Sequence, residues 1–312
     1  MRMYPEIFPY APKFGIMSEI GQPLRAIADR RATAAIAAAV IAAALGVGQL
    51  WFGQTAGVLA WRGTASTTGT VDEAAIVIWL SAVAVALAAA APMLLLKIKP
   101  PTNRRFLQIG MAVFGACLTV PVATAVAAVS QMYGGDLSQL RVTKLVVFGV
   151  ALGGLAALIS VRSQSAAWSL LYWLAIGWVL MWVSVNAEPA ISPMLGHLDP
   201  GPEWSASSRQ WQARMVLLAV AIAIGMALGA AARLRNWQVH GFAVTARWGS
   251  PITVSAGPGL MVAAYLAAAA IDGNVRIDVV VNLVVATVAA AGAAYGGMSL
   301  ARRASPIPLR TM

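Results

Sequence analysis

Residues 74–96 read "AAIVIWLSAVAVALAAAAPMLLL", an apolar stretch without a charged side chain. A helix over these residues rises about 35 Å at about 1.5 Å per residue, and a bilayer's hydrocarbon core is about 30 Å thick. Lipid provides no hydrogen-bond partners for an open backbone, so a segment of this kind inside a bilayer has to be helical. The stretch therefore predicts a helix that crosses a membrane.

Seven more apolar stretches have a similar length and are rich in Ala, Val, Leu and Gly. Hydrophobic residues make up 60% of the 312-residue chain and charged residues only 11%, a balance that one soluble core cannot bury. We predict an all-α, polytopic integral membrane bundle of about eight helices over residues 32–300, between a cytoplasmic N-terminal segment (1–31) and a cytoplasmic tail (301–312). The other predicted spans are 32–52, 106–129, 145–161, 167–187, 214–232, 251–271 and 279–300.

The basic residues give the predicted orientation. With the N-terminus inside, sixteen of the 22 Lys and Arg residues fall on the cytoplasmic side, and most of the 11 acidic residues fall on the other. Basic loops face the cytoplasm, so both termini are expected inside and the net charge of +11 indicates contact with a bilayer, with no nucleic-acid partner. The abundance of Ala, Val and Gly, with Arg far above Lys, is typical of a GC-rich bacterial genome. We therefore predict a location in the bacterial cytoplasmic membrane.

The loop lengths suggest an internal repeat. A long outer loop and then a basic inner loop follow the first predicted span, and the same order follows the fifth. Pro121 and Pro258 lie inside the third and seventh spans. These features indicate two four-helix halves of the same orientation, a 4+4 parallel pseudo-repeat. Few residues match between the halves, so a chance likeness of loop lengths is the alternative.

Two features inside the spans are candidates for ligand binding. Pro258 lacks the N–H that would bond the carbonyl four residues earlier, so "SAGPG" (255–259) predicts a kinked or open helix. Its backbone groups could bind a substrate, or the kink could simply pack against a neighbouring helix. An aromatic stripe along the fifth span could line a hydrophobic groove or face lipid. The candidate residues are Ser255, Gly257, Pro258 and Gly259 at the kink, and Trp178 and Trp182 in the stripe.

Three Gly-x-x-x-Gly pairs predict helix contacts. Glycines four residues apart lie on one helix face and let a second helix approach closely. The pairs are Gly149 and Gly153, Gly225 and Gly229, and Gly292 and Gly296. The spacing leaves open whether the neighbouring helix belongs to this chain, to a second copy of it or to a partner protein.

The outer loop after the fifth span, "NAEPAISPMLGHLDPGPEW" (186–204), carries the only candidate acid and base groups that we assign. They are Glu188, His197, Asp199 and Glu203. One histidine with three carboxylates at irregular spacing does not make a zinc motif, and the single cysteine excludes an intramolecular disulfide. We predict no metal site and no cofactor.

Further motifs for chemistry are absent from the sequence. It contains no phosphate-binding loop, no His-Glu-x-x-His and no nucleophile elbow, and its span interiors carry no charged group of the kind used for ion coupling. The favoured function is therefore a non-catalytic subunit or scaffold of a transport, secretion or cell-envelope assembly. A permease for a neutral or hydrophobic solute, and an outer-face enzyme acting on a lipid-linked substrate, are the alternatives.

Overall fold

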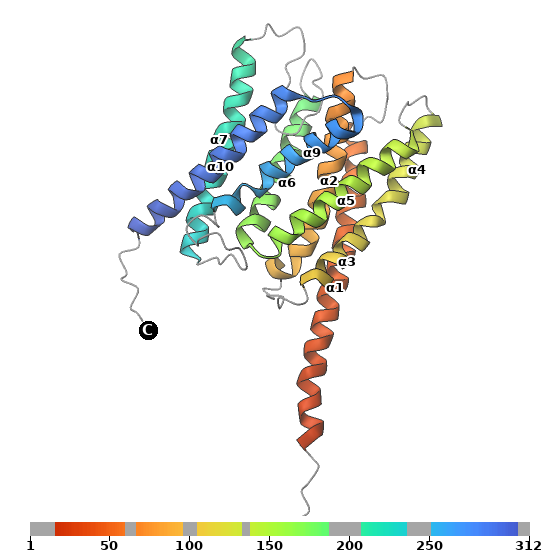
Figure 1. Ribbon diagram of the computed structural model, residues 1–312, viewed down its shortest axis with the longest axis vertical. Coiled ribbons are helices and arrows are strands. Elements are labelled where there is room, and N and C mark those ends of the chain that lie inside the picture. Colours follow the sequence, from red (N-terminus) through yellow and green to blue (C-terminus); the bar gives the residue numbers. More distant parts are fainter. Residues whose placement is uncertain are drawn as a thin grey trace, which may run out of the picture.

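The computed structural model describes residues 16–59, 67–95, 105–132, 138–186, 207–235 and 251–304 (Figure 1). Over these residues the chain is helical apart from short turns, and none of them forms a strand, so the all-α prediction is confirmed. The helices are α1 (Ile16–Thr55), α2 (Thr67–Leu95), α3 (Arg105–Cys117), α4 (Thr119–Met132), α5 (Gln139–Ser160), α6 (Gln164–Asn186), α7 (Ser207–Leu234), α9 (Ala256–Asp272) and α10 (Ile277–Ala304).

Seven apolar stretches in the described helices are long enough to cross a membrane. They are Ala32–Thr55, Val71–Leu95, Arg105–Ala128, Gln139–Ser160, Gln164–Trp182, Arg214–Leu234 and Ile277–Arg303. The predicted span 251–271 does not form one continuous helix. Residues 251–254 are helical, the chain turns at Ser255, and α9 then runs for 17 residues. The difference from the eight predicted helices therefore arises at the sequence that contains Pro258.

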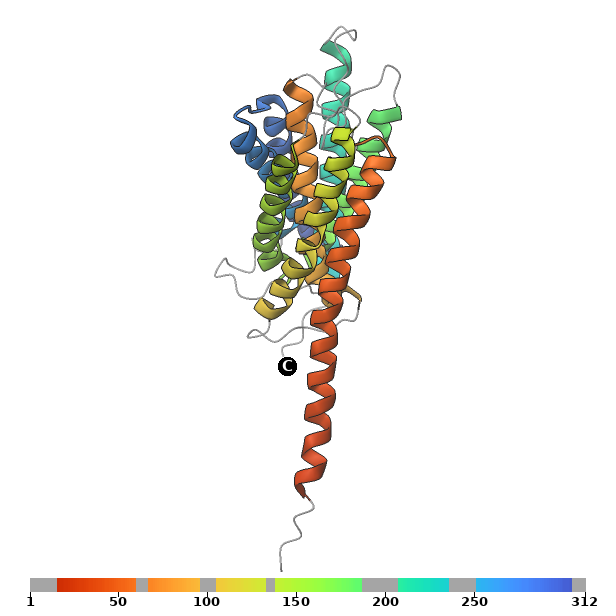
Figure 2. The same ribbon diagram turned by 90° about the vertical axis from the view of Figure 1, so that its right-hand side faces the viewer.

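The first helix begins well before its apolar stretch. Residues 1–31 are predicted as a cytoplasmic N-terminal segment, and α1 starts within it, at Ile16, and has 40 residues. At about 1.5 Å per residue this helix is about 60 Å long, roughly twice the thickness of a hydrocarbon core. Figure 2 shows its N-terminal half projecting beyond the other helices. The polar residues before Ala32 thus continue the helix rather than end it, which the apolar pattern alone does not indicate.

The centre of the bundle is α2. Every residue in its most apolar window is buried, and α2 contacts α1, α3, α5, α6 and α9. The Trp79 side chain is fully buried and lies against Gly177 of α6, where a Cβ atom would clash with the indole ring. The middle of this bundle is therefore filled by a helix and its side chains.

Glycine allows the close contact between α2 and α5. A Cβ atom built on Gly149 would lie 2.6 Å from the carbonyl oxygen of Ile78, and one on Gly153 would lie 2.6 Å from that of Ala82. A step of four residues along α5, from Gly149 to Gly153, matches a step of four residues in the same direction along α2, from Ile78 to Ala82. The two helices therefore run parallel. The same small-residue packing that operates in membrane helices holds this pair together.

A second parallel pair consists of α7 and α10. Gly225 faces the backbone of Ala290, and Gly229 faces that of Ala294, so closely that neither position has room for a side chain. The first two predicted glycine pairs thus meet helices of the same chain. Gly292 and Gly296 of α10 differ, since a Cβ atom at either position would meet no atom within 4 Å.

The third predicted span is also interrupted. The chain leaves the helix at Leu118 between α3 and α4, three residues before Pro121. The interruption at Ser255 likewise lies three residues before Pro258. Near the first interruption, Gly115 of α3 packs against the backbone of Ala39 in α1. The sequence marked the second interruption but did not predict the first.

Candidate functional site

The interruption at Ser255 is covered by α6. The hydroxyl of Ser169 donates a hydrogen bond to the carbonyl of Val254 and accepts one from the N–H of Gly257 at 3.1 Å. Val254 is the residue whose carbonyl Pro258 leaves without its helical partner. One buried serine therefore satisfies the backbone on both sides of the break, and the freed carbonyl is bonded to protein.

The two glycines beside Pro258 have different surroundings: Gly257 is buried and Gly259 is partly exposed. A Cβ atom on Gly257 would lie 2.5 Å from Cδ1 of Trp173, whose side chain is fully buried. Pro258 is buried as well, whereas Gly259 is partly exposed and its nearest neighbour is Thr287 of α10. Gly257 and Pro258 thus face the bundle, while Ser255 and Gly259 border a groove on its surface.

This groove, which we call the Ser255 groove, has a volume of about 400 Å³ and lies between α5, α6, α9 and α10. Its polar side chains are few and engaged: Ser255 donates to the carbonyl of Ile252 at 2.7 Å, and Thr287 donates to that of Leu283 at 2.6 Å. Leu155 and Ile252 at its rim are largely exposed. The groove can therefore hold an apolar group but offers few hydrogen bonds to orient a polar one.

The aromatic residues of α6 divide between core and surface. Trp178 packs against Phe52 of α1, with ring centroids 5.0 Å apart in an edge-to-face arrangement. Trp182 is 57% exposed. Trp168 and Tyr172 lie side by side, with ring centroids 6.0 Å apart, and border a second groove against α7. The predicted stripe therefore does not line a single ligand site.

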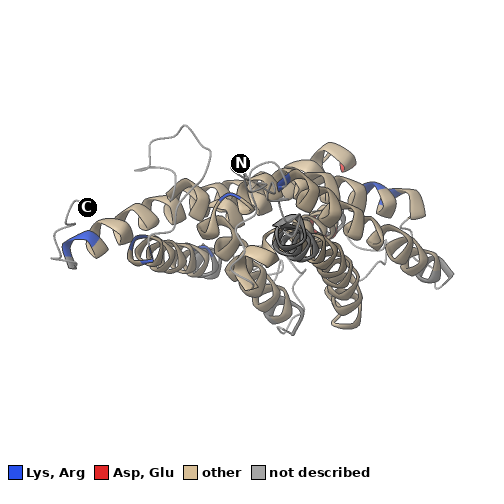
Figure 3. Ribbon diagram, turned by 90° about the horizontal axis from the view of Figure 1, so that it is seen from below, with Lys and Arg blue, Asp and Glu red and all other residues tan. Residues whose placement is uncertain are grey.

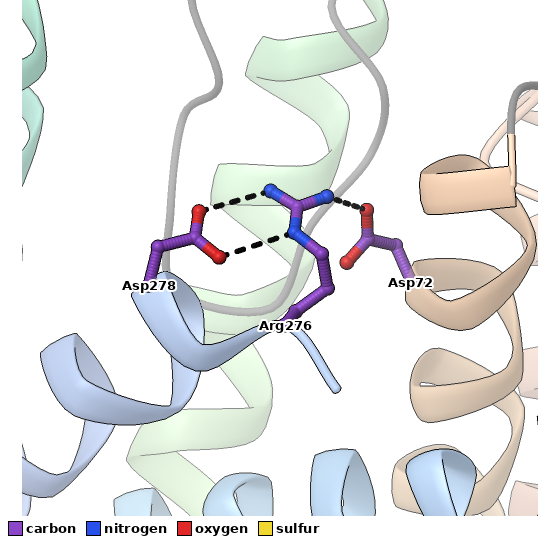
Figure 4. A network of polar contacts seen from close by, with 3 residues as sticks. All are labelled: Asp72, Arg276 and Asp278. Carbon is purple, nitrogen blue, oxygen red and sulfur yellow. Dashed lines mark hydrogen bonds and ion pairs between the residues drawn. The ribbon is translucent and has the colours of Figure 1, made fainter. Parts of the chain in front are cut away.

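An ion-pair network at the other end of the bundle escaped the sequence analysis (Figure 4). Arg276, in the connection between α9 and α10, bonds Asp72 of α2 at 2.9 Å. Its guanidinium also makes a two-point contact with Asp278, at 3.2 and 3.1 Å. The Asp72 side chain is only 1% exposed, whereas that of Asp278 is 45% exposed. The network thus ties the start of α2 to the start of α10.

A second ion pair lies at the same end of the helices. Arg141, in the first turn of α5, contacts both carboxylate oxygens of Asp272 at the end of α9, at 3.1 and 2.6 Å. These side chains are 26% and 12% exposed. The two ion-pair groups join α2 to α10 and α5 to α9, so they restrain the relative positions of these four helices.

The pKa of Arg276 reflects competing effects. Burial favours the neutral form and lowers the pKa, but the hydrogen bond to Asp278 and the negative charges of Asp72 and Asp278 raise it by more. The net pKa lies above the ordinary value, so the guanidinium stays charged throughout the range of ordinary experiments. The stabilisation it provides is therefore not lost by titration of the arginine itself at any pH below the ordinary arginine pKa, as long as the two carboxylates are ionised.

The outer-loop candidates Glu188, His197, Asp199 and Glu203 lie outside the described residues. Their proposed acid or base role stays a prediction. Within the described part of the chain, no group of three or more His, Cys, Asp or Glu side chains could hold a metal ion. Cys117 there is free and exposed.

No protein-family description matches this chain, and neither a curated protein nor a solved structure matches it. The function therefore has to be inferred from the sequence and structure of this chain.

Ser169→Ala tests whether the break is a packed feature. The change removes the hydroxyl that bonds Val254 and Gly257, and an unsatisfied buried backbone group costs about 1–3 kcal/mol. We expect a clearly lower melting temperature in detergent. Ser299→Ala is the matched control, because its hydroxyl bonds only the carbonyl of Tyr295 in its own helix. Equal melting temperatures for the two variants would show that Ser169 does not support the break.

Proposed function

We propose that the chain is a multi-pass protein of the bacterial cytoplasmic membrane, with eight crossings and both termini in the cytoplasm. The seven membrane-length helices support the membrane location, and the interrupted segment 251–272 supplies the eighth crossing. The distribution of charge supports the orientation. Asp72, Asp272 and Asp278 lie near the start of α2 and around the α9–α10 connection, whereas Glu19 and Asp29 belong to the polar start of α1. At its other end α10 has two arginines, seen as blue ribbon beside the C-terminus in Figure 3.

We also propose a 4+4 arrangement of two parallel halves. In the first half α1 packs on α3 and α2 on α5; in the second half α6 packs on α9 and α7 on α10. These are the first-with-third and second-with-fourth pairings in each half. The third member is interrupted three residues before a proline in both halves. The matching pairs and breaks support a repeat better than loop lengths do.

Within that membrane, we propose a non-catalytic role as a subunit or scaffold of a transport, secretion or cell-envelope assembly. The observation that carries this proposal is the open face of Gly292 and Gly296 on α10. The other two glycine pairs are filled by helices of the chain itself, but a Cβ atom at either position of this pair would meet no atom within 4 Å beyond its own helix backbone. The two glycines border a surface groove between α10 and α7. Small-residue faces of this kind accept a second helix closely.

The packing of the centre favours the same role. A carrier that moves a solute needs a path between helices, and here the central helix α2 is buried over its whole apolar window. Ion pairs at one end restrain α2, α5, α9 and α10 relative to one another. A rigid bundle with an unfilled lateral face suits a protein that holds a partner better than one that opens and closes around a substrate.

A permease for a hydrophobic solute is the second candidate, and the Ser255 groove favours it. The groove lies beside an interrupted helix and is lined almost entirely by apolar side chains. Interrupted helices commonly border substrate sites in transporters. The purified wild-type chain would then move such a solute across liposomes without any other protein, which a scaffold would not do.

Replacing Gly292 and Gly296 together by leucine tests the scaffold proposal. The two side chains would fill the open face of α10 and displace a partner helix, so we expect at least about a tenfold loss of co-purifying partner from native membranes. The fold should persist, since neither Cβ atom meets a neighbour within 4 Å. Gly110→Leu is the matched control, because Gly110 on α3 is likewise exposed and without a neighbour within 4 Å. Equal recovery of the partner with both variants would contradict the proposal.

A further inference from the structure

The groove between α6 and α7 has the features of a lipid site. This surface, the Trp168 groove, is lined by Trp168 and Tyr172 of α6, by the residues of α7 that face them, and by Arg235, with a volume of about 520 Å³. We propose that it binds one anionic phospholipid, with an acyl chain along α7 and the phosphate at Arg235. The inference rests on the proposed membrane location and is independent of the proposed scaffold role.

The length of the groove fits one leaflet. Its lining on α7 runs from Ala223 to Arg235, and twelve residues of helix rise about 18 Å. Half of a hydrocarbon core about 30 Å thick is about 15 Å. A groove that begins near the middle of the bilayer and ends in a charged residue therefore matches an acyl chain with its headgroup at the interface.

Between Ala223 and Ala231 the groove is lined by apolar and aromatic side chains. This lining suits an acyl chain that lies along α7. The floor of the groove along α7 is a row of small residues, Ala223, Ala227 and Ala231, at four-residue spacing, and the α6 aromatics form a wall beside it.

The charge at the end of the groove selects an anionic headgroup. Arg235 is exposed, and among the described residues no acidic side chain lines the groove with it. Trp168 is partly buried against the cluster of Leu228, Val254 and Ala294, so its indole is fixed beside the second half of α7. Tryptophan and tyrosine favour the interface between headgroups and acyl chains, and each basic residue near a membrane surface strengthens the binding of anionic lipid. The aromatic pair would thus contact the acyl chain of one phospholipid, and the arginine would contact its phosphate.

The test uses the full chain purified in detergent and titrated with phosphatidylglycerol or phosphatidylcholine, with bound lipid counted by native mass spectrometry. We expect wild type to bind phosphatidylglycerol several-fold more tightly than phosphatidylcholine. Arg235→Gln should reduce that preference about fivefold. Arg233→Gln is the matched control, because it removes the same charge from an exposed residue of α7 that does not line the groove.

A second variant fills the groove without changing charge. Ala227→Phe places a ring on the exposed floor and should abolish the tightly bound lipid, whereas Ala151→Phe on the exposed face of α5 should not. Unchanged melting temperatures would show that the variants fold. Equal affinity of wild type for the two lipids, equal effects of Arg235→Gln and Arg233→Gln, or a second protein chain protecting residue 227 would each overturn the proposal. Failure of the membrane location would appear separately, as a chain that fractionates without detergent.

Discussion

Gly153→Ala should strongly destabilise this protein, although it adds a single methyl group. The new Cβ atom would lie 2.6 Å from the carbonyl oxygen of Ala82 and 2.8 Å from its Cα atom. Both are backbone atoms in the buried part of α2, so neither can rotate away and the helices have to separate. Overpacking of this kind typically costs about 1–3 kcal/mol, and a contact between two backbones belongs at or above the upper end of that range.

The next residue provides a matched control. A Cβ atom on Gly154 would lie 3.4 Å from Cγ2 of Val113, which is an ordinary van der Waals contact. Alanine also favours a helix over glycine by about 0.5–1 kcal/mol, so Gly154→Ala should be neutral or slightly stabilising. Thermal unfolding of both variants in the same detergent measures the difference. If Gly153→Ala melted at the temperature of Gly154→Ala, the parallel contact between α2 and α5 would be wrong.

The second large effect is expected at Arg276. Arg276→Met removes the guanidinium and leaves the charge of Asp72, whose side chain is 1% exposed, without that partner. Breaking a buried ion pair by removing one member costs about 3–5 kcal/mol, which should lower the melting temperature by several degrees or more. Asp278→Asn should cost less than about 1 kcal/mol, because that side chain is 45% exposed.

A double variant separates the pair from its surroundings. Asp72→Asn with Arg276→Met removes both charges, so its destabilisation should be smaller than the sum of the two single effects. Additive effects would show that the contact between Arg276 and Asp72 contributes nothing of its own. Thermal unfolding is measured for the wild type, for the single variants Asp72→Asn and Arg276→Met, and for the double variant.

The helices were predictable from the sequence because apolar length is a local property. Residues 74–95 of the stretch 74–96 lie within α2, and the apolar stretches 32–52 and 145–161 lie within or nearly within α1 and α5. Helix ends were less predictable, since polar residues such as those before Ala32 extend a helix without changing the apolar pattern. Glycines on both sides of Pro258 indicated the interruption at Ser255. Pro121 has no glycine beside it, and the interruption at Leu118 was not predicted.

The contacts were not predictable, because they join distant residues. Arg276 meets Asp72 across 204 positions, and Arg141 meets Asp272 across 131. Three glycine pairs had the same spacing, yet only the packed structure distinguishes Gly149 and Gly225, which face helices of this chain, from Gly292. Nothing in the sequence distinguishes Ser169 from the other serines, because its bonds to Val254 and Gly257 join residues more than 80 positions apart. The Gly-x-x-x-Gly spacing therefore identified helix faces that allow close contact, and the fold shows which helix lies against each face.

Site-specific photo-crosslinking in native membranes tests the scaffold role most directly. A photoreactive side chain replaces Gly292 on the open face of α10, and the same side chain replaces Gly110 on α3 as the control. We expect a crosslinked product of defined mass from residue 292 and none from residue 110, with the mass distinguishing a partner protein from a second copy of the chain. Crosslinks from residue 292 to lipid alone would contradict it.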